Sequence, residues 1–171
     1  GALVKLTSPG PMFFRQQRTG LGGKPFAIFK LRTMCAEATS MHEELVAQSE
    51  QDGPAFKMAR DPRVTRVGQL LRKTSVDELP QLFNVLLGDM TLVGPRPLPC
   101  YESDECAPWQ RRRLDVTPGI TCIWQVEARS RVSFDEWMRM DLRYLRERSL
   151  VGDVMLLLRT VPAVISGKGA N

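Results

Sequence analysis

Residues 12–31 leave few choices of secondary structure. Two runs rich in aromatic residues flank the loop TGLGGKP, residues 19–25, which holds three glycines and a proline. Aromatic residues favour strands, and a glycine-rich loop lets the chain reverse direction between two paired strands. The pattern therefore predicts a β-hairpin.

Length and composition favour a single globular domain over residues 1–171. The chain has 171 residues, of which 43% are hydrophobic, and this is enough to bury a core. Four cysteines at irregular spacings and one histidine indicate neither a zinc site nor a disulfide framework. A reducing compartment is the simpler interpretation. No apolar run reaches the roughly 20 residues that span a bilayer.

Charge is distributed unevenly. Lys and Arg number 24 against 19 Asp and Glu, and the net charge of +5 favours an anionic partner such as a nucleic acid, an anionic lipid or a nucleotide phosphate. Residues 36–56 hold five acidic residues and no Lys or Arg, which predicts a solvent-exposed helix leading into a loop. Residues 57–73 hold six basic residues. A nucleic-acid-binding module is disfavoured, because no recognition motif accompanies these charges.

Two adjacent carboxylates follow the basic segment, in TSVDELPQL, residues 74–82. Ser75 and Glu78 have the spacing of a capping box at the start of a helix. Asp77 is the alternative cap, and it would place Pro80 more comfortably in the first turn. The sequence leaves both registers open.

In either register the environment favours ionised Asp77 and Glu78. Both lie at the positive end of the expected helix, next to Arg72 and Lys73. Neighbouring residues point roughly 100° apart around a helix, so the two carboxyl groups are not expected to share a proton. Each is free to take a separate role.

Several basic residues near this stretch are candidates for phosphate binding. The segment VGPRP, residues 93–97, fixes Arg96 in a short loop, and a guanidinium group suits bidentate contacts with phosphate. Further candidates are Lys30, Arg32, Arg63, Arg66, Arg72 and Lys73. Only two or three of these are expected to touch a ligand, because most residues of a basic stretch are solvated.

Two helical segments are expected near the end of the chain. Ser133 and Glu136 form another capping-box pattern before the first of them. The second carries an apolar stripe made of Val154, Leu157, Leu158, Val161 and Ile165. A helix that faces the core and a helix that lies on a bilayer are both compatible with this stripe.

Three blocks of sequence, in order, resemble the bacterial sugar transferases, also called monotopic phosphoglycosyl transferases. They are SPGPMFFRQQRTGLGGKPFAIFKLRTM, DPRVTRVGQLLRKTSVDELPQLFNVLLGDMTLVGPRPLP and VTPGITCIWQV. The resemblance implies transfer of a phosphosugar from a UDP-sugar to a polyprenyl phosphate such as undecaprenyl phosphate, with release of UMP. It also implies a compact, mostly helical α+β domain with a small β-hairpin and an active site that faces the membrane.

The resemblance assigns roles to individual residues. It implies that Asp77 is the nucleophile, which becomes an aspartyl phosphosugar in a two-step exchange. It associates Glu78 with Mg²⁺, which proteins hold through few carboxylates together with phosphate oxygens and water. Arg72 and Arg96 match positions that the family uses around the phosphates. Further substrate-binding candidates are Lys30, Arg32 and Arg129.

Two departures from the family pattern fall in the third block and just after it. Cys122 follows GIT, and Ala128 precedes Arg129, where family members commonly have glycine. Each adds a side chain where close approach or backbone freedom is used, which predicts altered donor preference. Trp124 is expected either to stack on a ligand or, as is more usual, to pack in the core.

The resemblance also bears on location and on competing functions. The family carries a re-entrant membrane helix before the first block, and the chain is expected to be the catalytic domain without it. The implied location is the cytoplasmic face of the bacterial inner membrane, with a monotopic or peripheral attachment. A nucleotide-sugar hydrolase and a catalytically silent membrane assembly partner are the alternatives. The residues do not indicate which sugar is transferred.

Overall fold

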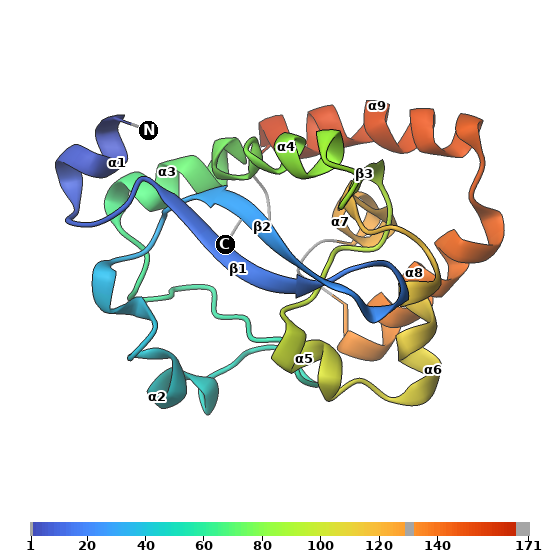
Figure 1. Ribbon diagram of the computed structural model, residues 1–171, viewed down its shortest axis with the longest axis horizontal. Coiled ribbons are helices and arrows are strands. Elements are labelled where there is room, and N and C mark those ends of the chain that lie inside the picture. Colours follow the sequence, from blue (N-terminus) through green and yellow to red (C-terminus); the bar gives the residue numbers. More distant parts are fainter. Residues whose placement is uncertain (1, 129–131, 167–171) are drawn as a thin grey trace.

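The computed structural model describes residues 2–128 and 132–166. Its first sheet is an antiparallel hairpin of β1 (Phe13–Thr19) and β2 (Pro25–Leu31), joined through the short 3-10 helix η1 (Leu21–Gly23). Gly22 and Gly23 have φ angles of 62° and 81°, which glycine adopts without strain. The predicted β-hairpin is confirmed, and Figure 1 shows it crossing the middle of the molecule.

Helices make up most of the remaining regular structure, which confirms the α+β fold class. The α-helices before residue 90 are α1 (Ala2–Thr7), α2 (His42–Val46), α3 (Arg66–Lys73) and α4 (Gln81–Leu86). The later ones are α5 (Cys100–Asp104), α6 (Pro108–Arg111), α7 (Ile123–Glu127), α8 (Phe134–Glu147) and α9 (Leu150–Ser166). Three further 3-10 helices are η2 (Ala36–Ala38), η3 (Val76–Glu78) and η4 (Arg112–Asp115).

The acidic segment forms less helix than the sequence predicts. Its regular structure is limited to η2 and the five residues of α2. The chain after α2 instead packs on the start of α8, where the Phe134 N–H donates to Asp52 Oδ1 at 2.7 Å. Gly53 follows with a φ of 73°, and a Cβ there would lie 2.8 Å from the Phe134 ring. These tertiary contacts replace the expected long helix.

A second, parallel sheet was not predicted. It pairs β3 (Thr91–Val93) with β4 (Gly119–Thr121), strands of three residues each. The backbones of the two strands approach closely just beyond β3. A Cβ on Gly119 would lie 2.1 Å from the backbone nitrogen of Gly94. A Cβ on Gly94 would lie 2.6 Å from the Thr117 carbonyl oxygen. Only glycine fits at either position.

Two clusters of buried apolar side chains support these elements. One joins the loop before α3 and the segment before α5 to α8, through Ala55, Leu98, Phe134, Trp137 and Met138 among others. The second joins β3, α7, α8 and α9 through Val93, Ile123, Tyr144 and Leu156. The α8 capping box is confirmed: Ser133 Oγ accepts from the Glu136 N–H, and the Glu136 carboxylate accepts from the Ser133 N–H at 3.1 Å.

The last helix buries a different face from the predicted stripe. Leu156 is buried and Leu157 packs beside it, but Val154, Leu158 and Val161 are between 47% and 62% exposed. The side chain of Ile165 lies outside the described part. Figure 1 shows α9 and α4 along the same edge of the molecule, and both pack on β3. Among the described residues, no helix combines the length and the apolar character needed to cross a bilayer.

Candidate active site

The two adjacent carboxylates lie in η3, between α3 and α4. Ser75, which precedes η3, has a φ of 54° and is the one non-glycine residue with positive φ in the described part of the chain. Its hydroxyl caps no helix, and α4 begins after Pro80 without a side-chain cap. Both capping predictions, at Ser75 and at Asp77, are therefore wrong. A strained backbone next to two carboxylates is typical of functional sites.

Glu78 is held by two cations from distant parts of the chain. Lys30 Nζ on β2 donates to Glu78 Oε1 at 2.7 Å. Arg96, in the loop after β3, donates from Nη2 to the same oxygen at 2.5 Å and from Nη1 to Oε2 at 3.3 Å. Burial alone would raise the pKa of Glu78, but Arg96 and Lys30 hold it well below the usual range. Glu78 is therefore an anion, as predicted.

Asp77 is the neighbouring buried carboxylate, and its electrostatics differ. Burial and the adjacent charge of Glu78 raise the pKa of Asp77, and they outweigh the nearby cations Lys30, Arg72 and Arg96. The prediction that the surroundings favour the ionised form is thus wrong in direction for Asp77. In the described part of the chain, Asp77 has no ion-pair partner within 4.0 Å, whereas Glu78 has two. A carboxylate that is not paired within the protein keeps its oxygens available to a ligand.

The cations Lys30 and Arg96 are themselves fixed. Burial lowers the pKa of Lys30 to about 8, although Glu78 opposes this shift. The Arg96 carbonyl accepts a hydrogen bond from Arg113 Nη2 at 2.5 Å. In the amide orientation that satisfies its neighbours, Gln125 Oε1 accepts from Arg96 Nη1 at 3.0 Å. Arg113 therefore holds the backbone of Arg96, and Gln125 holds its guanidinium group.

The other predicted site residues lie in different settings. Arg72 is close enough to Asp77 to act on its charge, and its Nε donates to Thr33 Oγ1 at 3.0 Å. Arg32 is buried, and its guanidinium donates to the carbonyls of the segment before β1, including Ser8 at 2.9 Å and Pro9. Arg129 lies outside the described residues. The structure thus gathers Lys30, Arg72 and Arg96 around the carboxylates, whereas Arg32 binds backbone.

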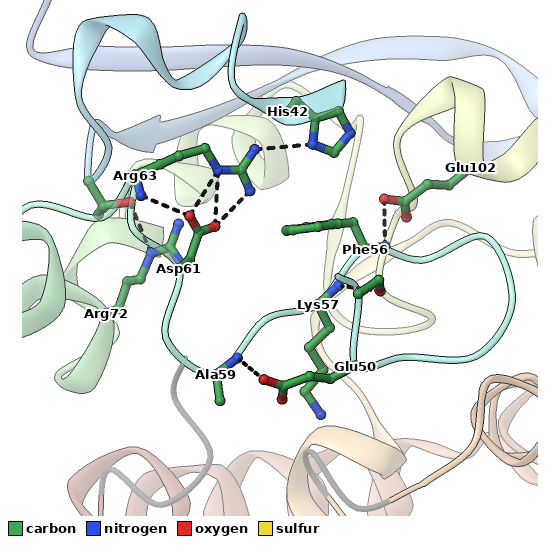
Figure 2. Close-up of polar contacts among 11 residues, drawn as sticks. His42, Glu50, Phe56, Lys57, Ala59, Asp61, Arg63, Arg72 and Glu102 are labelled. Atoms are coloured by element: carbon green, nitrogen blue, oxygen red, sulfur yellow. Dashed lines mark hydrogen bonds and ion pairs between the residues drawn. The ribbon is translucent and has the colours of Figure 1, made fainter. Parts of the chain in front are cut away.

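Figure 2 shows another wall of the site, formed by the loop between α2 and α3. Arg63 and Asp61 form a buried ion pair, with Nη2 and Oδ2 2.6 Å apart. Arg63 Nη1 also lies 3.1 Å from His42 Nδ1, and its guanidinium stacks 4.8 Å from the centre of the Phe56 ring. Glu102 accepts from the Phe56 N–H at 3.4 Å. Arg63 has its charge paired within the protein, so it supports this wall.

A cavity of about 1110 Å³ connects these groups. Lys30, Arg72, Asp77, Glu78 and Arg96 all line it. The volume exceeds the roughly 300–1,000 Å³ of typical small-molecule sites. A smaller cavity of about 230 Å³, between α7, α8 and α9, contains neither carboxylate. The large cavity has room for a nucleotide sugar beside Asp77.

Arg18 and Thr33 also line the cavity, and sequence reasoning missed both. The signal for Arg18 is the hairpin register, in which Arg18 lies opposite Phe26 while Lys30 lies opposite Phe14. Side chains alternate between the faces of a strand, so Arg18 and Lys30 share one face. The register becomes readable only once the hairpin turn is fixed.

Of the two departures from the family pattern, Cys122 is buried and Ala128 is partly exposed, and Trp124 lies between them. Trp124 packs against Trp137, with ring centres 4.5 Å apart, so the packing alternative is the one observed. Trp124 also lines the cavity. Cys122 is 1% exposed, and burial raises the pKa of its thiol well above the usual range. A neutral, buried thiol adds volume behind Arg96 and no charge.

The carboxylates of Asp77 and Glu78 are the groups that fit a divalent cation here. In the described part of the chain, no cluster of three or more His, Cys, Asp or Glu residues could hold a metal by itself. Mg²⁺ is usually bound through one or two carboxylates together with substrate phosphates and water. A cation that arrives with a diphosphate matches this donor set. All four cysteines are free thiols.

Comparison with known proteins gives one consistent result. Residues 1–167 match the family model described as bacterial sugar transferase. The chain is 44% identical over 177 residues to UDP-glucose:undecaprenyl-phosphate glucose-1-phosphate transferase of Caulobacter vibrioides, covering 98% of this chain and 61% of that protein. It is 41% identical over 163 residues to galactosyl transferase CpsE of Streptococcus agalactiae, covering 95% of this chain and 36% of that protein.

A third relative is the undecaprenyl-phosphate galactose phosphotransferase of Salmonella typhimurium, with 40% identity over 168 residues. That alignment covers 94% of this chain and 35% of the relative. The chain therefore spans between about a third and three fifths of the length of these three proteins.

Proposed function

Because the chain belongs to the bacterial sugar transferase family, we propose that it transfers a phosphosugar from a UDP-sugar to a polyprenyl phosphate. The observation that carries the proposal is the position of Asp77, a buried carboxylate that lines a large cavity among Lys30, Arg72 and Arg96. The names of the relatives support undecaprenyl phosphate as the acceptor and, for the Caulobacter protein, a UDP-sugar as the donor.

In the proposed reaction, a carboxylate oxygen of Asp77 attacks the phosphorus that bears the sugar. A new bond forms between this oxygen and phosphorus, and the bond to the bridging oxygen of the diphosphate breaks. The electron pair of the broken bond stays on the phosphate of the departing UMP, so no proton is required. An oxygen of the polyprenyl phosphate then attacks the same phosphorus and displaces the carboxylate, in a ping-pong sequence.

Charge neutralisation is the main task of the surrounding residues. An anionic carboxylate that approaches an anionic diphosphate is repelled, and preorganised cations offset this repulsion. Lys30, Arg72 and Arg96 all lie close enough to Asp77 to act on its charge, and Lys30 and Arg96 also bind Glu78. Mg²⁺ bound through Glu78 and phosphate oxygens would supply further positive charge.

A donor panel tests the proposal directly. The protein is incubated with Mg²⁺ and individual UDP-sugars without lipid, and UMP release and the intact-protein mass are recorded. We expect one equivalent of UMP and a mass gain of one phosphosugar with the correct donor. Continued UMP release without a mass gain would instead indicate a nucleotide-sugar hydrolase. No reaction with any donor would remove the proposal.

Replacing Glu78 with Gln is expected to lower turnover by at least about tenfold, because an amide neither neutralises the two cations nor binds Mg²⁺ well. The measurement is the rate of UMP release across a Mg²⁺ titration, with circular dichroism to verify the fold. Glu37→Gln, an exposed change in η2, serves as the control and should behave as wild type. An unchanged Mg²⁺ titration in Glu78→Gln would show that another group holds the metal.

We further propose that the edge formed by α4 and α9 lies on the cytoplasmic face of the membrane. Leu86 and Phe83 of α4 are 82% and 62% exposed, and Leu150 and Leu158 of α9 are 82% and 62% exposed. Between these helices, Leu92 of β3 is 44% exposed. Large apolar patches of this kind mark interaction surfaces, and helices with one apolar face bind bilayers in the interfacial plane.

The double change Leu86→Asp with Leu158→Asp is expected to weaken binding to phosphatidylglycerol-containing vesicles by about tenfold or more. Burial of each Leu side chain in the bilayer interface would otherwise contribute about 1.5–3 kcal/mol to the binding free energy. Cosedimentation measures the bound fraction. Val46→Asp, on α2 at the opposite edge in Figure 1, is the matched control, since Val46 is 50% exposed. Equal loss of binding in both variants would contradict the assigned orientation.

A further inference from the structure

Arg18 is a cavity-lining cation that the reaction described so far does not use. It lies on β1, on the hairpin face that also carries Lys30. The backbone next to it is tied to the loop after β3, through a bridge to Pro99 and a hydrogen bond from the Thr19 N–H to the Leu98 carbonyl at 3.0 Å. Arg18 is thereby fixed beside the loop that carries Arg96.

The guanidinium of Arg18 has unused hydrogen-bond donors. Nη1 donates to the Pro97 carbonyl at 3.0 Å, but Nε is buried without a partner. Within the part of the chain that the structure describes, no carboxylate lies within 4.0 Å of its nitrogen atoms. Arg63 and Arg113 are buried, and each has a carboxylate within 2.7 Å, whereas Arg18 is partly buried and has none among the described residues. A buried Nε donor without a partner is unfavourable unless a ligand supplies an acceptor.

The electrostatics around Arg18 favour an anion. Burial and the nearby charge of Arg96 lower the pKa of Arg18 to about 10, against the opposing effect of Glu102 and Glu78. Glu78 already pairs with Lys30 and Arg96, and burial raises the pKa of Glu102. Arg96 therefore shares its carboxylate partner Glu78 with Lys30, and burial disfavours the ionised form of Glu102, the carboxyl group that acts most strongly on Arg18.

We propose that Arg18, together with Arg96, binds the phosphate that stays with the nucleotide when Asp77 takes the phosphosugar. This inference rests on the proposed transfer reaction and assigns the second phosphate of its donor. The sugar-linked phosphate must lie at Asp77, where Arg72 is the adjacent arginine. The next phosphate along the diphosphate can then reach Arg96, whose charge acts on both Asp77 and Arg18, and Arg18 lines the same cavity.

The position gives Arg18 a role in bond cleavage as well as in binding. While the diphosphate is intact, the nucleotide-side phosphate carries one negative charge. When the bridging bond breaks, its electron pair remains on that phosphate, which then carries two. A guanidinium with free N–H donors binds the developing dianion more strongly than the reactant, and this difference lowers the barrier.

Binding of UMP to the protein tests the assignment without catalysis. Isothermal titration calorimetry compares wild type with Arg18→Gln, and uridine serves as a phosphate-free ligand. Loss of charge-assisted hydrogen bonds is expected to weaken UMP binding by roughly tenfold to a hundredfold, with uridine binding unchanged. Arg15→Gln is the matched control, because Arg15 lies on the same strand, is exposed and lies outside the cavity. It should bind UMP as wild type does.

The outcomes separate this inference from the proposed function. If wild type forms the Asp77 adduct while Arg18→Gln binds UMP as tightly as wild type, the result supports the transfer reaction and contradicts the role of Arg18. Equal weakening for UMP and uridine would also overturn it, because a general disturbance of the site produces that result. If circular dichroism shows that Arg18→Gln does not fold, Arg18→Lys replaces it. Lysine keeps the charge but lacks the fork, so binding at least severalfold weaker is expected, and wild-type binding would overturn the role.

Discussion

Asp77→Asn is expected to form no covalent adduct and to lose turnover by about 10⁴-fold or more, as removal of a catalytic nucleophile does in other enzymes. An amide of the same shape preserves the packing of η3 but offers no anionic oxygen to attack phosphorus. Intact-protein mass spectrometry with each UDP-sugar and Mg²⁺ detects the adduct, and UMP release measures turnover. Asp115→Asn, at an exposed position in η4, is the control and should retain both.

The stability of Asp77→Asn separates loss of chemistry from loss of fold. Burial raises the pKa of Asp77 above its unfolded-state value, so the folded protein holds the proton more tightly than the unfolded chain. Stability from this group is therefore complete at low pH and declines as pH rises through the folded-state pKa. Asn removes this decline, so at pH 7 the variant should unfold at the same or a higher denaturant concentration. An adduct that persists in the folded variant would show that another residue is the nucleophile.

Arg113→Met is expected to lower the free energy of unfolding by about 3–5 kcal/mol at pH 7, because it leaves a buried carboxylate without its partner. Arg113 Nε donates to Asp141 Oδ2 at 2.8 Å, and both side chains are at most 3% exposed. Burial raises the pKa of Asp141 to about 6 even with this guanidinium alongside. Without it the pKa rises further, so the stability loss should be smaller at pH 5, where Asp141 takes up a proton.

Urea denaturation at the two pH values measures this effect. Arg112→Met is the matched control, because Arg112 is exposed and lies 3.8 Å from Asp115, and it should change stability by about 0.5 kcal/mol or less. Combining Arg113→Met with Asp141→Leu should recover part of the loss, since two apolar groups can replace a buried ion pair. Wild-type stability in Arg113→Met would show that Asp141 finds another partner. Turnover should fall as well, because Arg113 also holds the backbone of Arg96.

Local signals were the part of the fold that the sequence predicted well. The hairpin turn and the α8 capping box depend on residues close together in the chain, and both are confirmed. The prediction of a capping box at Ser75 is wrong, because Glu78 pairs with residues distant in sequence. The Glu78 carboxylate binds Lys30, 48 residues earlier, and Arg96, 18 residues later, and so does not turn back to the helix start. The three-residue strands β3 and β4 are too short to leave a periodic signal.

Much of the candidate site could also be assembled in advance. Asp77, Glu78, Lys30, Arg72 and Arg96 were all named from sequence and resemblance, and they line one cavity. Residue type alone did not separate arginines that face this cavity with free donors from those that bind the protein itself. Arg32 donates to three backbone carbonyls and Arg63 binds a carboxylate, whereas among the described residues the guanidinium of Arg18 makes one hydrogen bond, to the Pro97 carbonyl. That distinction depends on tertiary structure.

The close backbone contact between Gly94 and Gly119 has a consequence for protein engineering. No side chain mediates this contact, so neither partner can compensate for a shifted neighbour by repacking. In a chimera of two relatives, residues 91–99 and residues 117–121 must therefore be transplanted together as one module. If either stretch is grafted alone, the loop that carries Arg96 packs against backbone from the other relative. Donor preference would then change because the loop shifts, and not because of the grafted side chains.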